Sequence, residues 1–259
     1  MQVTVLMAVY NGMDTVVGAI NSVLDQTFDD FELLVVDDAS TDGTSDVLDE
    51  FQSRNRRVRV LHNAPNRGMA ASLNIGIQNA GGELIARLDA DDLCLPERLK
   101  QQVDFMNGHP EISVLGGAAQ LIDEAGQSLG TEQRPETHDE LVSRIYRECP
   151  FYHPSVMVRR NFYEEYGGYD ERMKRSCDYD LWLKGCRSHR YHNLCEPLIR
   201  YRVRNKPVAK DLYEVSLALA LAGYRERTPL KCGLAISRYV ASNALSVMGL
   251  RQSWPRRAA

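Results

Sequence analysis

Three carboxylates fall within four positions of the stretch ARLDADD, at Asp89, Asp91 and Asp92. They directly follow the apolar run ELIARL, which reads as a buried strand. Like charges this close raise one another's pKa unless a cation or hydrogen-bond donors compensate. Carboxylates two positions apart on one turn can face the same hard divalent cation, with diphosphate oxygens completing its coordination. The pattern therefore favours a metal and phosphate site, and a solvated acidic loop is the alternative.

A second acidic pair, Asp37 and Asp38, follows the apolar run FELLVV. The nearby Asp42 and Thr44 are residue types that cap helix N-termini, so a purely structural turn is the alternative for this segment. A second acid at the strand end is not needed for capping. Asp38 is therefore the stronger candidate for ligand binding.

The elements that must position these acids alternate along the first half of the chain. Apolar runs predict strands at 3–9, 31–36, 58–61 and 83–88, and helical periodicity predicts helices at 13–26, 44–53 and 69–80. Strands buried on both faces that alternate with helices indicate an α/β fold with a Rossmann-like, mainly parallel central sheet flanked by helices. Ligands bind such sheets outside the carboxyl ends of the strands, where both acidic groups fall.

The pattern continues with a helix near Pro96 and a fifth strand within ISVLGGAAQLID, and it changes from about residue 131. The polar stretch TEQRPETHDE precedes a short helix, a strand in HPSVMVRR, a helix in DYDLWLKGC and a bent strand or strand pair in YHNLCEPLIRYRV. We expect a domain at 1–204, with halves 1–125 and 126–204, the second containing mixed sheet. A helical extension, 205–259, follows it, with helices at about 208–227 and 231–249.

The composition limits the class of protein. Of 259 residues, 44% are hydrophobic and 25% charged, as in soluble globular proteins. A net charge of −4 does not suggest nucleic-acid binding. The six cysteines form no CxxC pair and show no zinc-ligand spacing, and no window is apolar enough to span a membrane. The start, MQVTVLMAVYNG, lacks the features of a secretory signal, so we expect a cytoplasmic protein.

Other phosphate-binding motifs are absent. A dinucleotide-binding turn needs GxGxxG after the first strand, where this chain has YNGMDT, and no GxxxxGK[ST] occurs. A sugar nucleotidyltransferase would share the sheet, but its first loop is normally glycine-rich and basic, and this loop has no Lys or Arg.

Together these segments resemble the inverting family 2 glycosyltransferases of the GT-A fold, particularly bacterial enzymes of extracellular polysaccharide and O-antigen synthesis. The resemblance runs through residues 1 to about 204 in the family's order. Its segments are VLMAVYNG, DQTFDDFELLVVDDASTDGT, NRGMAASLNIGI, GELIARLDADD with PERLKQQ, FYHPSVMVRR and CDYDLWLKG. It implies transfer of a sugar from a nucleotide-sugar, expected to be UDP-linked, to a hydroxyl of a glycan or lipid-linked glycan.

The resemblance also implies the residues of the donor site. Ala8, Tyr10 and Asp38 would surround the nucleoside, with the Tyr10 ring stacked on the base. Asp89 and Asp91 would form the DXD motif that holds Mn²⁺ or Mg²⁺, with Asp89 directed to the ribose or the metal. The loop that closes over the donor would contain Asn66, Arg67 and Gly68. Arg87 either assists this site or anchors its loop through a salt bridge.

On the acceptor side, the resemblance implies that Asp178 is the catalytic base, which removes a proton from the acceptor hydroxyl. Helix capping is the structural alternative for Asp178, and Asp180 is the weaker candidate for the base. Trp182 offers an apolar face for a sugar but equally suits the core. His153 either contacts the acceptor or is a buried structural histidine.

Two positions depart from the family pattern. Cys177 stands where Glu is common, which removes a carboxylate next to the base and keeps open a non-catalytic nucleotide-sugar-binding subunit. Arg204 stands where relatives often have His. Arginine cannot ligate a metal but binds diphosphate bidentately, so Arg202 or Arg204 is expected to stabilise the leaving group.

The C-terminal extension is basic, with nine Lys or Arg against three Asp or Glu over 206–259. Such a segment can lie on an anionic membrane surface, on the inner face of the cell membrane, which would suit a lipid-linked acceptor. The alternatives are a helical hairpin packed on the domain and a homodimer contact.

Overall fold

The computed structural model describes residues 1–174, 176–203, 233–234 and 236–237. One nine-stranded sheet runs in the order β3-β2-β1-β4-β8-β6-β9-β5, and β7 pairs with β6 beside this path. The predicted α/β fold with a mainly parallel central sheet is confirmed. Most of the predicted extension lies outside the described residues, and 233–234 and 236–237 are helical.

The first half of the chain builds parallel sheet, as its apolar runs predict. The pairs β1–β2, β2–β3 and β1–β4 are parallel. Each predicted strand and helix lies within a few residues of its expected position. The elements are β1 (Val3–Val9), α1 (Val16–Leu24), β2 (Phe31–Asp37), α2 (Thr44–Arg54), β3 (Val58–His62), α3 (Met69–Asn79) and β4 (Leu84–Arg87).

The second half adds mixed sheet to the same layer. Strand β8 is antiparallel to both β4 and β6, and β9 is parallel to β6 with register shifts that bend it. The hairpin strand β7 was not predicted, because all its residues are exposed. The elements are β5 (Leu93–Cys94), α4 (Arg98–Gly108), β6 (Ile112–Ile122), β7 (Ser128–Glu132), α5 (His138–Arg144), a 3₁₀ turn (His153–Ser155), β8 (Met157–Arg159), α6 (Arg160–Tyr166), α7 (Cys177–Gly185) and β9 (Arg190–Arg202).

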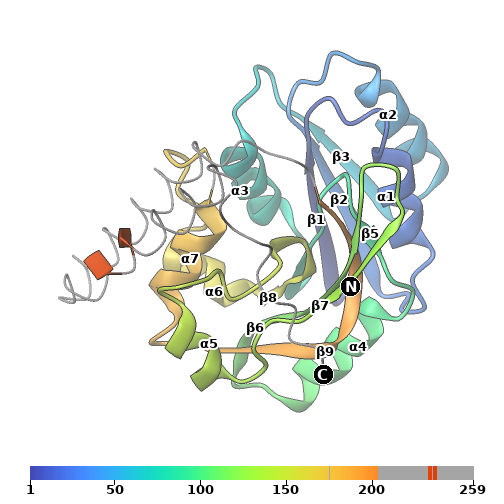
Figure 1. Ribbon diagram of the computed structural model, residues 1–259. Coiled ribbons are helices and arrows are strands. Elements are labelled where there is room, and N and C mark those ends of the chain that lie inside the picture. Colours follow the sequence, from blue (N-terminus) through green and yellow to red (C-terminus); the bar gives the residue numbers. More distant parts are fainter. Residues whose placement is uncertain (175, 204–232, 235, 238–259) are drawn as a thin grey trace.

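Helices cover both faces of this sheet, and two hydrophobic cores result. Helices α1, α2 and α4 pack on one face, around Ile20 and Leu99. Helices α3, α6 and α7 pack on the other, around Leu73 and Trp182, and Figure 1 shows α3 and α1 on opposite sides of β1. The carboxyl ends of the parallel strands therefore meet at one rim between the helix layers, which is where the candidate site lies.

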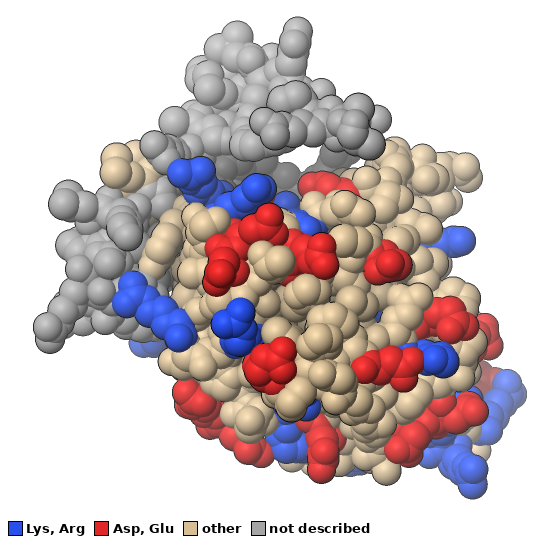
Figure 2. Space-filling view, turned by 90° about the horizontal axis from the view of Figure 1, so that it is seen from below, with Lys and Arg blue, Asp and Glu red and all other residues tan. Residues whose placement is uncertain are grey.

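Within the described residues, no helix is long and apolar enough to cross a membrane. Figure 2 shows a face on which acidic and basic side chains alternate, with a gathering of acidic groups beside basic ones. The described part of that face has no broad basic surface of the kind that a nucleic-acid backbone requires.

Candidate active site

A pocket of ≈ 260 Å³ opens at the rim where β1, β2 and β4 end. It contains five of the predicted donor-site residues: Ala8, Tyr10, Asp38, Asp89 and Asp91. The remaining lining comes from neighbouring positions and from the end of β9: Val9, Asn11, Gly12, Thr15, Met69, Ser72, Ala90, Asp92, Tyr201 and Arg202. Segments that are far apart in sequence thus meet at the pocket, as the ends of parallel strands do.

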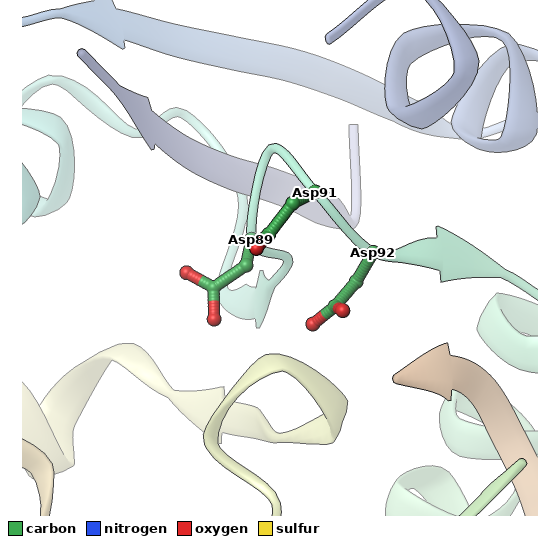
Figure 3. Close-up of side chains that lie close together, drawn as sticks. All are labelled: Asp89, Asp91 and Asp92. Atoms are coloured by element: carbon green, nitrogen blue, oxygen red, sulfur yellow. The ribbon is translucent and has the colours of Figure 1, made fainter. Parts of the chain in front are cut away.

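The turn after β4, residues 89–92, carries the three acids and is called the acid turn below. One carboxylate oxygen from each of Asp89, Asp91 and Asp92 lies within 4.8 Å of the others. In Figure 3 the Asp91 side chain runs toward Asp89, and the side chains of Asp89 and Asp92 point to the same side of the turn. Three converging carboxylates are the donor set that a hard divalent cation prefers.

Asp92 belongs to the predicted acidic cluster, but the sequence assigned the DXD motif to Asp89 and Asp91 only. Its side chain is 1% exposed, and its Oδ1 accepts a hydrogen bond from the backbone N–H of Arg202 at 2.7 Å. Its Oδ2 is buried and has no hydrogen-bond partner among the described residues. Burial, together with Asp89 and Asp91, raises the pKa of Asp92 well above its ordinary value. A buried, unpartnered carboxylate oxygen beside two other acids fits a site built for a cation.

Two buried arginines hold the acid turn. Arg87 forms an ion pair with Asp89 and donates a hydrogen bond to the carbonyl of Leu88. Arg98, in the predicted helix after Pro96, donates to the carbonyl of Arg87 at 2.7 Å. Both arginines are at most 1% exposed, so neither can reach an exposed ligand. Of the two expected roles of Arg87, the structure shows the anchoring of the loop through a salt bridge.

Tyr10 and Asp38, which were expected to contact a nucleoside, both line the pocket. Tyr10 follows β1 and is 54% exposed, which leaves a ring face open for stacking. Asp38 is 4% exposed and accepts hydrogen bonds at 2.8 Å from the amide of Asn63 and the backbone N–H groups of Arg67 and Gly68. Because a carboxylate has about four acceptor positions, one remains for a ligand donor.

The loop predicted to close over the donor is tied to Asp38. The Asn66 amide donates to the Asp38 carbonyl at 2.9 Å, and the Arg67 side chain is exposed at the surface. Gly68 has φ 87° and ψ 161°, a conformation that essentially only glycine adopts. None of these three residues lines the pocket itself, so in this conformation they act on it through Asp38.

Asp178 lies in the first turn of α7, after the N-cap residue Ser176, and is half-buried. It accepts a hydrogen bond from the Cys149 thiol, with Sγ 3.8 Å from Oδ2. Asp180 is fully buried and paired with Lys184 at 2.5 Å, which is a structural arrangement. Cys177 is 4% exposed, so its thiol does not form part of the acceptor-facing surface.

His153 begins the 3₁₀ turn that precedes β8. Its Nε2 is 2.9 Å from the hydroxyl of Tyr169. Burial lowers the pKa of His153, while the nearby carboxylates of Asp178 and Asp89 oppose that shift. The ring is only half-buried, so both alternatives for His153, acceptor contact and structural role, remain compatible with its position.

Trp182 is not available to an acceptor. It is 0% exposed and packs against the rings of Phe151, Phe162 and Tyr191, with centroids 5.3–6.4 Å apart. The predicted sugar contact is therefore wrong in this structure, and the core alternative holds. The helical pattern of α7 could not reveal this, because nearly all of its residues are buried.

The two arginines expected at the leaving group differ in what the structure describes. Arg204 lies outside the described residues. Arg202 lines the pocket, and its Nε donates to the Asp91 carbonyl at 2.9 Å. Its Nη1 donates to the carbonyls of Asp123 and Glu124 at 3.0 and 2.7 Å. Arg202 thus connects the end of β9 to the acid turn and to the β6–β7 turn.

With this geometry in place, comparison with known proteins identifies the class. The chain matches the family model "Glycosyl transferase family 2" over residues 4–167. It is 33% identical over 244 residues to the putative glycosyltransferase EpsE of Bacillus subtilis, covering 93% of this chain and 87% of that protein. It is 30% identical to the O-antigen biosynthesis glycosyltransferase WbnJ of Escherichia coli, with 81% and 82% covered. The chain belongs to glycosyltransferase family 2 and is a glycosyltransferase.

Solved structures show the same fold. S. aureus TarS in complex with UDP-GlcNAc matches with a TM-score of 0.73 at 19% identity, over 95% of this chain and 76% of that one. The mannosyltransferase PcManGT of Pyrobaculum calidifontis, in complex with GDP-Man and Mn²⁺, matches with a TM-score of 0.67 at 17% identity, over 98% and 76%. The predicted GT-A fold is confirmed.

Proposed function

We propose that this glycosyltransferase moves a sugar from a UDP-sugar to a hydroxyl of a glycan or lipid-linked glycan, with inversion at the anomeric carbon. The observation that carries the proposal is the convergence of Asp89, Asp91 and Asp92 at a pocket that also contains Tyr10 and Asp38. A nucleoside diphosphate needs an aromatic face, a polar group for its base or ribose and a site for its charge. This one pocket offers all three.

The acid turn would hold Mn²⁺ or Mg²⁺ through Asp91, with Asp89 and Asp92 beside it. When bound, such an ion supplies positive charge that stabilises the negative charge developing on the departing diphosphate. The relative PcManGT was solved with Mn²⁺, which supports this choice of ion. The buried Asp92 Oδ2, which has no partner among the described residues, supports a cation site independently of any relative.

Asp178 would act as the base. An inverting displacement requires a carboxylate that removes the acceptor proton while the sugar carbon is attacked from the face opposite the leaving group. Asp178 suits this role better than Asp180, because Asp180 is buried and paired with Lys184. The acceptor class, a bacterial surface polysaccharide or its lipid-linked precursor, rests on the similarity to WbnJ.

The test is calorimetric binding of UDP and GDP, each with and without Mn²⁺. We expect UDP to bind only with Mn²⁺, and we expect Asp91→Ala to abolish this binding. Asp104→Ala is the matched control, because Asp104 is an exposed acid on α4 that pairs with Lys100. If wild-type protein binds neither nucleotide with or without Mn²⁺, the donor-site assignment is wrong. Binding of UDP without transfer to any acceptor would instead support the non-catalytic alternative.

A further inference from the structure

Tyr201 lies at the end of β9, next to the acid turn, and lines the pocket. Its backbone position is fixed by its neighbours, because it pairs with Leu121 of β6 and precedes Arg202. The Arg202 backbone N–H and Nε bind the Asp92 carboxylate and the Asp91 carbonyl. The ring of Tyr201 is therefore held beside the acid turn without any need for its own hydroxyl.

A series of side-chain contacts links Tyr201 to the neighbourhood of the candidate base. The Tyr201 ring packs on Tyr152, with centroids 5.3 Å apart and planes inclined by 54°. The Arg134 guanidinium lies 4.6 Å from the centre of the Tyr152 ring. Arg134 is also 3.7 Å from Glu148, which directly precedes Cys149, the hydrogen-bond partner of Asp178. Tyr201 thus stands at the pocket end of a series of side-chain contacts that leads toward Asp178.

The carboxylates of the acid turn and of Asp178 act electrostatically on the Tyr201 phenol. Burial is the largest cause that raises the pKa of Tyr201, and four acids add to it: Asp89, Asp92, Asp91 and Asp178. A tyrosine phenol, with an ordinary pKa of about 10, is protonated at neutral pH and can donate a hydrogen bond. A sugar joined to a diphosphate at the acid turn would lie in the same pocket, beside the Tyr201 side chain that lines it.

We propose that Tyr201 is a specificity-determining residue that contacts the transferred sugar ring. Its aromatic face packs against the apolar face of a pyranose, and its hydroxyl donates to a sugar hydroxyl. This inference rests on the proposed function, because it requires a nucleoside diphosphate at the acid turn. It adds a sugar contact on β9, in addition to the donor-site residues at the ends of β1, β2 and β4.

The test separates the affinity for the nucleotide from the affinity for the sugar. Calorimetry with Mn²⁺ compares UDP with UDP-glucose, UDP-galactose and UDP-GlcNAc, and the sugar with the largest gain over UDP is used for the variants. Tyr201→Phe is expected to weaken binding of that UDP-sugar about tenfold, and Tyr201→Ala more, because one hydrogen bond and then the ring contact are lost. Affinity for UDP should change less than about twofold in both variants, since UDP lacks the contacted group.

Tyr166→Phe is the matched control, because Tyr166 lies on α6, packs against Phe162 and does not line the pocket. It should leave both affinities unchanged. Equal affinity of wild type and both Tyr201 variants for the UDP-sugar overturns the inference, and so does an equal loss of UDP affinity, which would make Tyr201 a nucleotide contact. Absence of UDP binding in the wild type overturns the proposed function as well, so the two failures are distinguishable.

Discussion

Replacing Asp92 with Asn is expected to stabilise the metal-free protein while weakening its response to Mn²⁺. The side-chain oxygen of Asn can still accept the hydrogen bond that the Arg202 backbone N–H now donates to Asp92 at 2.7 Å. The substitution therefore removes one negative charge from the acid turn and keeps the contact that fixes it to β9. Asp92→Asn therefore tests the charge of this side chain separately from its hydrogen bond to Arg202.

The magnitude follows from the spacing of the acids. One oxygen from each of Asp89, Asp91 and Asp92 lies within 4.8 Å of the others. Two unit charges at that distance repel by about 3.5 kcal/mol at an effective dielectric constant of about 20, and by about 0.9 kcal/mol in bulk water. Asp89 retains a 25% exposed side chain, so water screens part of the repulsion. We expect a gain of about 1–3 kcal/mol in the free energy of unfolding without metal at pH 9, because the pKa of Asp92 is raised and its carboxyl carries more of its charge at high pH.

The assay is thermal and urea unfolding of wild type and Asp92→Asn, with EDTA and with saturating Mn²⁺. In wild type, Mn²⁺ should raise the melting temperature, because a ligand that binds only the folded state stabilises it. In Asp92→Asn the metal-free melting temperature should be higher and the Mn²⁺ shift smaller. Asp104→Asn is the control, since Asp104 is 64% exposed and should change neither value.

A lower metal-free stability in Asp92→Asn, combined with an unchanged Mn²⁺ shift, would refute this reasoning. That result would mean that the Asp92 carboxylate is needed to hold β9 in place and that its charge is not part of a cation site. The unpartnered Oδ2 would then have a structural explanation.

Three further predictions concern the candidate base, the core and a histidine at the end of β3. Asp178→Asn should lower kcat by about 10²–10⁴-fold with little change in the Kd for UDP, as loss of a general base does, and steady-state kinetics with calorimetry will check this. Trp182→Ala should lower the free energy of unfolding by about 3–5 kcal/mol in urea titration, because the indole is fully buried among aromatic rings. Burial opposes the charged form of His62, but hydrogen bonds with Asp37 and Asp49 outweigh it and raise its pKa. The stabilisation from protonated His62 is therefore fully present below the unfolded-state pKa of about 6.5 and is lost as pH rises through the folded-state pKa. His62→Gln should then destabilise the protein more at pH 6 than at pH 9, as measured by urea unfolding.

The first half of the fold could be predicted because parallel strands buried on both faces appear as continuous apolar runs. All seven residues of β2 are buried, and the run FELLVV marks that strand directly. Strand β8 has only three residues, and β7 has no buried residue, so neither gives a clear periodic signal. Strand β9 reads ambiguously because register shifts against β6 interrupt its alternation.

The sequence predicts those pocket residues that directly follow a recognisable strand. It does not predict those that reach the pocket through the pairing of distant strands. Asp38, Asp89 and Asp91 follow strands whose ends must meet, so spacing alone brings them to one pocket. The roles of Asp92 and Tyr201 depend on β9 pairing with β6 and β5, which no local pattern encodes. The sequence leaves Trp182 open as either a sugar contact or a core residue. A helix that is buried on nearly every side has no distinct polar face to tell these alternatives apart.

The acid turn is held from several directions by groups that do not occupy its open side. Arg87 pairs with Asp89 from within the core, and the Arg202 backbone N–H binds Asp92 from β9. The Arg202 guanidinium donates a further hydrogen bond, to the backbone carbonyl of Asp91. These contacts offset part of the repulsion among the carboxylates, yet Asp92 Oδ2 remains buried and unpartnered among the described residues. In the proposed function, such an arrangement would keep the geometry of the site and leave a carboxylate oxygen available to a cation that accompanies the diphosphate.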